Sequence, residues 1–112
     1  METPEEVPFE IDVLELRAWL DQGRELVVVD VREPYEHQIC HLEGAALIPL
    51  RELPQRLVDL DRETLTVVYC HHGPRSSYAV TFLRQQGFAR ATNLGGGIDA
   101  WSQEVDPAVP RY

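Results

Sequence analysis

Short β-branched runs alternate along this chain with segments of helical periodicity, and this alternation strongly limits the folds open to it. The runs span residues 26–31, 45–48, 65–69 and 91–94. The first, LVVVDV, is apolar without a period of two, which is typical of a parallel strand buried on both faces. Helical segments and short connections separate the runs. The sequence therefore predicts an α/β fold, an open and mostly parallel sheet with helices on both faces.

The helical segments have recognisable starts and stops. Val13, Leu16 and Leu20 repeat at i, i+3 and i+7, with Asp12 as a candidate N-cap and Gly23 as a stop, which predicts a helix over residues 12–22. Pro34 begins a second, through about residue 37. The others are a third helix marked by Leu53, Leu57 and Leu60, a fourth over residues 76–86, and a short last one containing Ala100 and Trp101.

Length and charge narrow the functional classes. With 112 residues, the chain is expected to have a lead-in over residues 1–10 and a single domain over residues 11–112. The net charge is -9, and all ten basic residues are arginines. Such an acidic chain repels nucleic acids and anionic membranes, so we expect neither as a partner. A small anionic substrate remains compatible, because a local cluster of donors acts at close range.

The chain has two cysteines, Cys40 and Cys70, which are too few for a disulfide framework. The first ten residues lack the basic start and apolar run of a signal peptide, and no stretch is long enough to span a bilayer. These features predict a reducing, cytoplasmic setting with free thiols.

The segment Cys70-His71-His72-Gly73-Pro74-Arg75-Ser76 carries the chemistry. It joins a predicted strand to a helix start, where the helix dipole and free backbone N–H groups favour a nucleophilic thiolate. Glycine lets the loop curl with its amides turned inward, the arginine adds a fixed positive charge, and both histidines can donate hydrogen bonds. The pattern predicts an anion cradle with Cys70 as its nucleophile.

The same segment resembles the active-site loop of rhodanese-like domains, with glycine at the fourth position and arginine at the sixth. Three further stretches agree in the right order. Asp30-Val31-Arg32 resembles that family's Asp-Val-Arg segment. His41-Leu42-Glu43-Gly44-Ala45 resembles its Gly-His-Ile-Pro-Gly-Ala stretch, and the run from Leu94 to Trp101 resembles its closing Gly-Gly and Ala-Trp.

The resemblance implies a rhodanese-like fold and a thiosulfate sulfurtransferase. Cys70 would take a sulfane sulfur from an anionic donor as a persulfide and pass it to cyanide or a thiol. The substrate-binding residues would be His71, His72, Gly73, Pro74, Arg75 and Ser76. Asp30 and Arg32 are candidates for lining the pocket. Asp30 could instead orient Arg32, or be a buried acid that accepts from loop amides, which is the favoured alternative. Neither a metal nor an organic cofactor is implied, and a protein could serve as sulfur donor or acceptor.

Cys40 and Glu43 depart from the family pattern, which usually has glycine and proline there. Cys40 could resolve the Cys70 persulfide into a disulfide, or simply fill an apolar gap. His37, Cys40 and His41 have a spacing that could hold zinc on a helix, but a fourth ligand is not evident.

Two rival functions remain open. Cysteine-based phosphatases and arsenate reductases use a related loop, but they place five residues between cysteine and arginine, whereas four separate Cys70 from Arg75. The second rival is a carrier module that receives sulfur from a partner enzyme.

Overall fold

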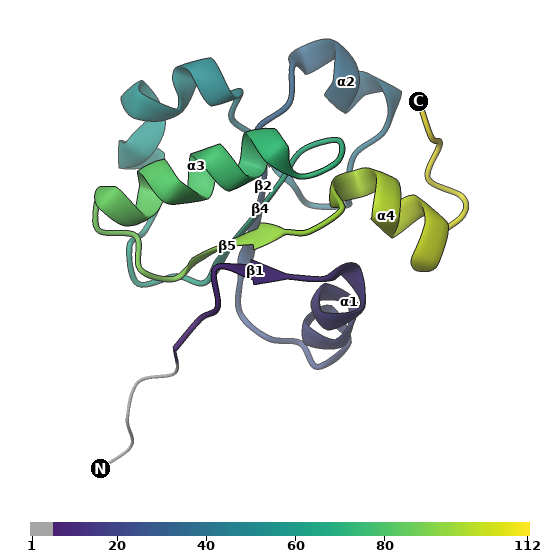
Figure 1. Ribbon diagram of the computed structural model, residues 1–112, viewed down its shortest axis with the longest axis horizontal. Coiled ribbons are helices and arrows are strands. Elements are labelled where there is room, and N and C mark those ends of the chain that lie inside the picture. Colours follow the sequence, from purple (N-terminus) through teal and green to yellow (C-terminus); the bar gives the residue numbers. More distant parts are fainter. Residues whose placement is uncertain (1–5) are drawn as a thin grey trace.

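The computed structural model describes residues 6–112, and within them five parallel strands form one sheet (Figure 1). The strands are β1 (Glu10–Ile11), β2 (Val27–Asp30), β3 (Ala46–Leu47), β4 (Thr66–Tyr69) and β5 (Ala91–Leu94). Their order is β1-β5-β4-β2-β3, so β4 is central. The predicted α/β fold class with a parallel sheet is confirmed.

Strand β1 was not predicted from the sequence, because two residues are too few to show a period of two. It pairs with β5 through Glu10 opposite Asn93 and Ile11 opposite Leu94. Val7, just before it, is buried. The predicted lead-in over residues 1–10 therefore ends inside an edge strand, because its last residue, Glu10, is the first of β1. The first five residues lie outside the described part of the chain.

Helices cover both faces of the sheet (Figure 1). On one face, α1 (Val13–Asp21) and α4 (Gly97–Glu104) form a core that includes Tyr69. On the other, α3 (Pro74–Gln85) and the 3-10 helix η1 (Leu50–Asp59) form a second core that includes Cys70. Because neighbouring strand residues point to opposite faces, the end of β4 sends Tyr69 to one core and Cys70 to the other.

The predicted helix starts are mostly confirmed. Asp12 caps α1, accepting a hydrogen bond from Glu15 N at 2.8 Å. The third predicted helix is η1, which is a 3-10 helix with Pro54 inside it. Proline has no N–H to close an α-helical bond, which disfavours an α-helix there.

Two helix boundaries differ from the prediction, and both concern the site. Helix α2 (Pro34–Ile39) continues two residues beyond the expected end. Helix α3 begins at Pro74 rather than at residue 76, with Gly73 as its N-cap at φ +125°. Proline at the first helical position needs no hydrogen-bond partner for its nitrogen. The earlier start places Arg75 and Ser76 in the first turn of α3.

No helix in residues 6–112 has both the length and the apolar character to cross a membrane.

Candidate functional site

Cys70 lies immediately after β4, with only 1% of its surface exposed. Its Sγ accepts a hydrogen bond from Gly73 N at 3.0 Å. The sulfur therefore faces the backbone that leads into α3, where N–H groups have no partner within the helix. The loop 70–73 holds the sulfur at a helix N-terminus, as the sequence predicted.

Ser76 supplies a second polar group to the sulfur, with its Oγ 3.4 Å from Sγ. The same hydroxyl lies 3.1 Å from the carbonyl oxygen of Gly73 and hydrogen-bonds to Oδ1 of Asn93. A hydroxyl carries one proton, so these acceptors compete for it. Ser76 can thus turn its proton toward a negative sulfur or leave it on Asn93, a residue that the sequence analysis missed.

Helix α4 supports the loop from behind. Ile98 N donates to Cys70 O at 3.0 Å, and Asp99 N donates to His71 O at 3.1 Å. A β-carbon at Gly97 would come within 2.5 Å of both carbonyl oxygens. The missing side chain of Gly97 therefore permits the close passage of the α4 backbone against the loop.

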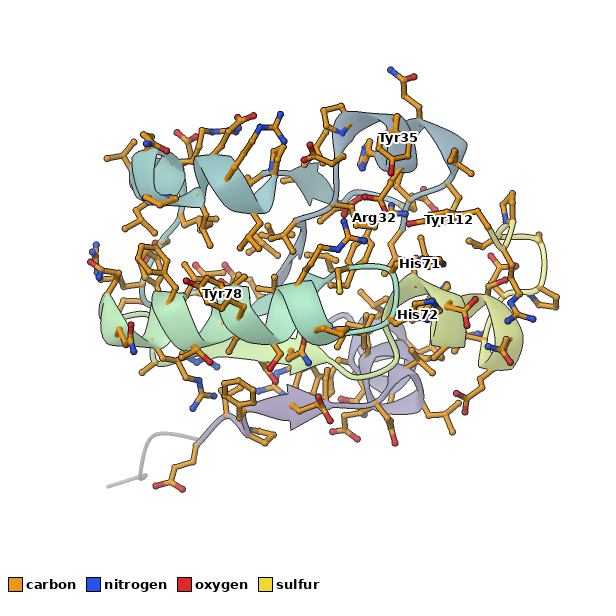
Figure 2. All side chains as sticks on the ribbon, turned by 45° about the horizontal axis from the view of Figure 1, so that its top comes forward. Arg32, Tyr35, His71, His72, Tyr78 and Tyr112 are labelled. Atoms are coloured by element: carbon orange, nitrogen blue, oxygen red, sulfur yellow. The ribbon has the colours of Figure 1, made fainter. Side chains whose placement is uncertain are left out.

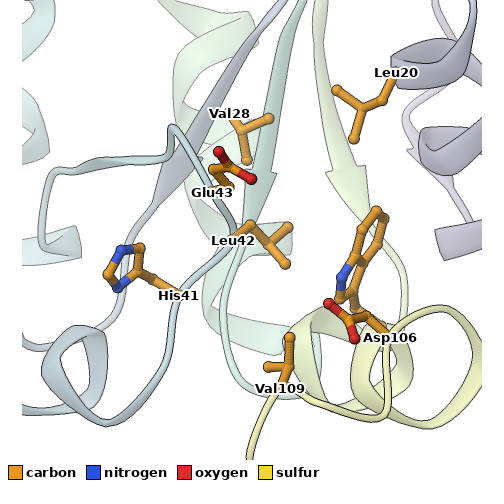
Figure 3. A pocket seen from close by; sticks show the side chains of 8 residues that line it. Leu20, Val28, His41, Leu42, Glu43, Asp106 and Val109 are labelled. Atoms are coloured by element: carbon orange, nitrogen blue, oxygen red, sulfur yellow. The ribbon is translucent and has the colours of Figure 1, made fainter.

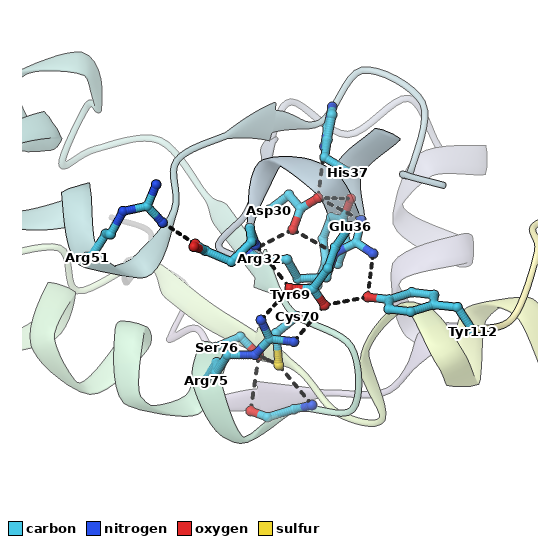
Figure 4. A network of polar contacts seen from close by, with 12 residues as sticks. Asp30, Arg32, Glu36, His37, Arg51, Tyr69, Cys70, Arg75, Ser76 and Tyr112 are labelled. Atoms are coloured by element: carbon cyan, nitrogen blue, oxygen red, sulfur yellow. Dashed lines mark hydrogen bonds and ion pairs between the residues drawn. The ribbon is translucent and has the colours of Figure 1, made fainter. Parts of the chain in front are cut away.

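Arg75 is held by an acid that the sequence analysis did not single out. Its Nη1 and Nη2 donate to Glu36 Oε1 and Oε2 at 2.7 and 2.9 Å (Figure 4). The hydrogen bonds from Arg75 lower the pKa of Glu36 to about 2, and Glu36 in turn raises the pKa of Arg75. The charge of Arg75 is consequently balanced within the protein.

Asp30 and Arg32 form a fully buried ion pair next to this site. Asp30 Oδ1 accepts from Arg32 Nε at 2.9 Å, and Oδ2 accepts from Nη2 at 2.7 Å. Burial alone would raise the pKa of Asp30, but the hydrogen bonds from Arg32 and His37 outweigh it and lower that pKa. Asp30 thus orients the Arg32 side chain, and it also accepts from the backbone N–H of Arg32 at 3.0 Å, so two of the roles offered above are found. Pocket lining by either residue stays a prediction.

The two histidines of the loop differ in exposure. His72 is exposed, whereas His71 lies between the rings of His72 and Tyr112, with centroid distances of 4.0 and 3.9 Å (Figure 2). Burial lowers the pKa of His71, which favours the neutral ring. Within residues 6–112, His71 Nε2 is buried without a hydrogen-bond partner. Tyr112 is another site residue that the sequence analysis missed.

The comparisons with known proteins agree with this geometry. The model of the rhodanese-like domain matches residues 12–104. The chain belongs to the rhodanese-like family. A probable adenylyltransferase/sulfurtransferase, MoeZ of Mycobacterium tuberculosis, is 42% identical over 100 residues, which are 88% of this chain and 26% of that protein. The chain thus spans about a quarter of the length of this relative.

Two further matches have nearly the size of this chain. A sulfurtransferase of Allochromatium vinosum is 35% identical over 100 residues, covering 89% of this chain and 94% of that protein. The crystal structure of a rhodanese-like domain protein from Staphylococcus aureus superposes with a TM-score of 0.81 at 28% identity, covering 94% and 99% of the two chains. The predicted family, a rhodanese-like sulfurtransferase, is confirmed.

Cys40 and the histidines near it have partners of their own in this rhodanese-like fold. Cys40 Sγ lies 3.3 Å from Pro110 O, His37 Nδ1 lies 2.8 Å from Asp30 Oδ2, and His41 Nδ1 lies 2.9 Å from His37 O. Helix α2 ends before Cys40, so the helical spacing suggested for zinc does not extend that far. Cys40 packs in the α1/α4 core and Cys70 in the α3/η1 core.

A second group of potential metal ligands lies at the loop. His71, His72 and Asp99 place three ligand atoms within 4.8 Å of one another. The two histidine rings are stacked with their centroids 4.0 Å apart, an arrangement in which lone pairs lying in the ring planes converge poorly on one ion. Arg111 and Gln103 already engage Asp99. We therefore assign no metal to this group.

A pocket lies on the α1/α4 side of the rhodanese-like fold (Figure 3). Apolar side chains of Leu20, Leu42 and Trp101 line it together with the acids Glu43 and Asp106. None of the residues described as lining it belongs to the loop 70–76. The pocket is distinct from the sulfur site.

Proposed function

We propose that this chain transfers a sulfane sulfur from thiosulfate or a related donor to a thiophilic acceptor through a Cys70 persulfide. The Cys70 thiolate attacks the outer sulfur of thiosulfate, the new S–S bond forms, and sulfite leaves with the electron pair of the broken bond. Cyanide or a thiolate then attacks the outer sulfur. The products are thiocyanate or a new persulfide, and the Cys70 thiolate.

The arrangement of donors around the Cys70 sulfur carries the proposal. Gly73 N–H already points at Sγ, and Ser76 Oγ lies beside it. A persulfide extends the negative charge one atom farther along the α3 N-terminus. The remaining backbone N–H groups of the loop, those of His71, His72, Arg75 and Ser76, can stabilise it there, whereas Pro74 has no N–H to donate. These donors suit a single large anionic atom.

The charge balance bears on the choice of donor. Arg75 is paired with Glu36, and Arg32 with Asp30. The loop therefore offers an anionic donor the dipoles of its backbone N–H groups and an arginine that is already paired with Glu36, rather than an unpaired positive charge. An anionic donor such as thiosulfate would approach Arg75 from its partly exposed side while Glu36 stays bound to it.

The test is to incubate the purified protein with thiosulfate, record the intact mass, and then measure thiocyanate after adding cyanide. Wild type is expected to gain one sulfur atom and release it to cyanide. Cys70→Ala is expected to do neither, while Cys40→Ala is the matched control and does both. A sulfur gain that persists in Cys70→Ala would overturn the role of Cys70.

The carrier function is the second candidate, favoured by the relative that is both adenylyltransferase and sulfurtransferase and of which this chain spans about a quarter. A carrier would receive its sulfur from a partner protein. Loading of Cys70 by a cysteine desulfurase and its substrate, combined with no loading by thiosulfate, would favour the carrier function.

A free catalytic thiol needs a reducing compartment, so the cytoplasmic setting stays part of the proposal. Hydrolysis of an aryl phosphate would instead support the phosphatase rival.

A further inference from the structure

The segment that follows α4 runs from the back of the loop toward α2 (Figure 1). Four consecutive residues of this segment, 109–112, are each anchored. The contacts are Ser102 Oγ to Val109 O, Cys40 Sγ to Pro110 O, Arg111 to Asp99, and Tyr112 to Glu36. All of residues 105–112 lie beyond the stretch that the family model matches.

Tyr112 connects the charged groups at the end of this segment (Figure 4). Its hydroxyl donates to Glu36 Oε2 at 2.7 Å and accepts from Arg32 Nη1 at 2.7 Å. Burial raises the pKa of Tyr112 to about 12, so the phenol keeps its proton at neutral pH and remains a donor. Its ring stacks on His71, beside Cys70.

The phenol disperses the negative charge of Glu36, which matters for an anion that must reach Arg75. Glu36 has two other donors, Arg75 and the backbone N–H of Glu33. Its side chain is buried, so each donor counts more than it would in water. Without the phenol, Oε2 would keep only its hydrogen bond from Arg75 Nη2, so more of its charge would be unscreened.

We propose that Tyr112 is a positioning residue for donor specificity, which screens Glu36 so that the Cys70 loop admits an anionic donor. Tyr112 does not touch the reacting sulfur. It acts through Glu36 and Arg75 on the charge that an approaching anion meets. The assignment to thiosulfate rests on the proposed function, but the screening itself is independent of it.

The test compares two alkylating reagents of similar size and different charge, iodoacetate and iodoacetamide. The rate of Cys70 alkylation is measured with each, and mass spectrometry of peptides separates Cys70 from Cys40. In Tyr112→Phe, which keeps the ring, the iodoacetate rate is expected to fall about threefold relative to the iodoacetamide rate. Glu36→Gln removes the charge itself, so the ratio is expected to rise.

Tyr35→Phe is the matched control, because Tyr35 is exposed on the same helix as Glu36 and also loses only a hydroxyl. Its ratio is expected to equal that of wild type. Thermal unfolding shows whether each variant is folded. A Tyr112→Phe ratio equal to wild type, or an equal fall with both reagents, overturns the proposal.

The thiosulfate assay completes the experiment. If the proposed function holds, Tyr112→Phe is expected to raise KM for thiosulfate about threefold with kcat within about twofold of wild type. A fall in kcat at unchanged KM contradicts the screening role. If wild type has no thiosulfate activity, the proposed function fails, while the alkylation ratio still decides the role of Tyr112.

Discussion

Arg75 donates two hydrogen bonds to Glu36 across 39 residues of sequence, at 2.7 and 2.9 Å. The pair joins the helix that follows the cysteine loop to the helix that follows β2. The arginine therefore has two tasks, which are to fix α3 against α2 and to offer its remaining donors to an anion.

Arg75→Lys separates the charge of this arginine from its forked geometry. A lysine keeps the positive charge but cannot bind both carboxylate oxygens of Glu36 and still present a donor to thiosulfate. We expect KM for thiosulfate to rise roughly fivefold, with a smaller change in kcat. Steady-state thiocyanate kinetics measure both. Arg17→Lys, on the exposed surface of α1, is the control and is expected to match wild type.

The stability of the protein is expected to depend on Glu36 at acid pH. The pKa of Glu36 is lowered from 4.5 to about 2 by Arg75. A carboxyl with a lowered folded-state pKa stabilises fully above its unfolded pKa and loses that contribution as pH falls through the folded value. We expect roughly 2 kcal/mol at neutral pH, after allowing for the partial exposure of Arg75.

Urea unfolding of wild type and Glu36→Gln at several pH values tests this expectation. The stability difference between the two proteins is expected to be full at pH 7 and to shrink between about pH 4.5 and pH 2. Asp30 titrates in both proteins, so the difference isolates Glu36. A difference that stays constant across this range would contradict the assignment.

Ser76→Ala removes the hydroxyl donor beside the sulfur. The amide of Gly73 remains, so we expect persulfide formation to continue with kcat about tenfold lower and KM little changed. Rapid mixing with thiosulfate, followed by mass spectrometry, gives the rate of sulfur gain. Ser77→Ala, one position farther along α3, is the control. An unchanged kcat in Ser76→Ala would leave the hydroxyl with a structural role only.

Gly97→Ala tests the close packing of α4 on the loop. Gly97 and Gly23 both have positive φ, +60° and +69°, but a β-carbon would meet the loop carbonyls only at Gly97. We expect Gly97→Ala to be less stable than Gly23→Ala by about 2 kcal/mol, and to lose most of its activity. Urea unfolding and thiocyanate release provide the two readouts. Equal losses in both variants would show that backbone strain alone matters.

The parts of the fold that follow local rules could be predicted from the sequence. The β-branched runs predicted four strands, Asp12 and Pro34 indicated where helices begin, and Gly23 indicated where one ends. The anion-binding role of the loop 70–76 could also be predicted from local sequence, because a cysteine, a glycine and an arginine lie close together between a predicted strand and a predicted helix. The structure brings these residues to one helix N-terminus.

The residues that were missed depend on contacts distant in sequence. In the sequence, nothing distinguishes Glu36 from other helix residues, because its contact with Arg75 depends on how α2 packs. Its position three residues after Glu33 was nevertheless a signal of a capping box. Tyr112 lies 80 residues from Arg32 and 76 from Glu36, and no periodicity links them. Asn93 lies in β5, a strand whose residues are all buried, and no sequence pattern there distinguishes a functional amide from the residues that pack the core.

Strand β1 has a consequence for how the domain is delimited. Glu10 accepts a hydrogen bond from Asn93, which in turn accepts one from Ser76, and Arg84 of α3 donates to Val7 O. Residues 7–10 all precede the first residue that the family model matches. A fragment or chimera cut at positions 12 and 104 would keep the cysteine but lose the support that reaches it from both ends of the chain. The hydrogen bonds that support the cysteine loop therefore begin outside the residues by which the family is recognised.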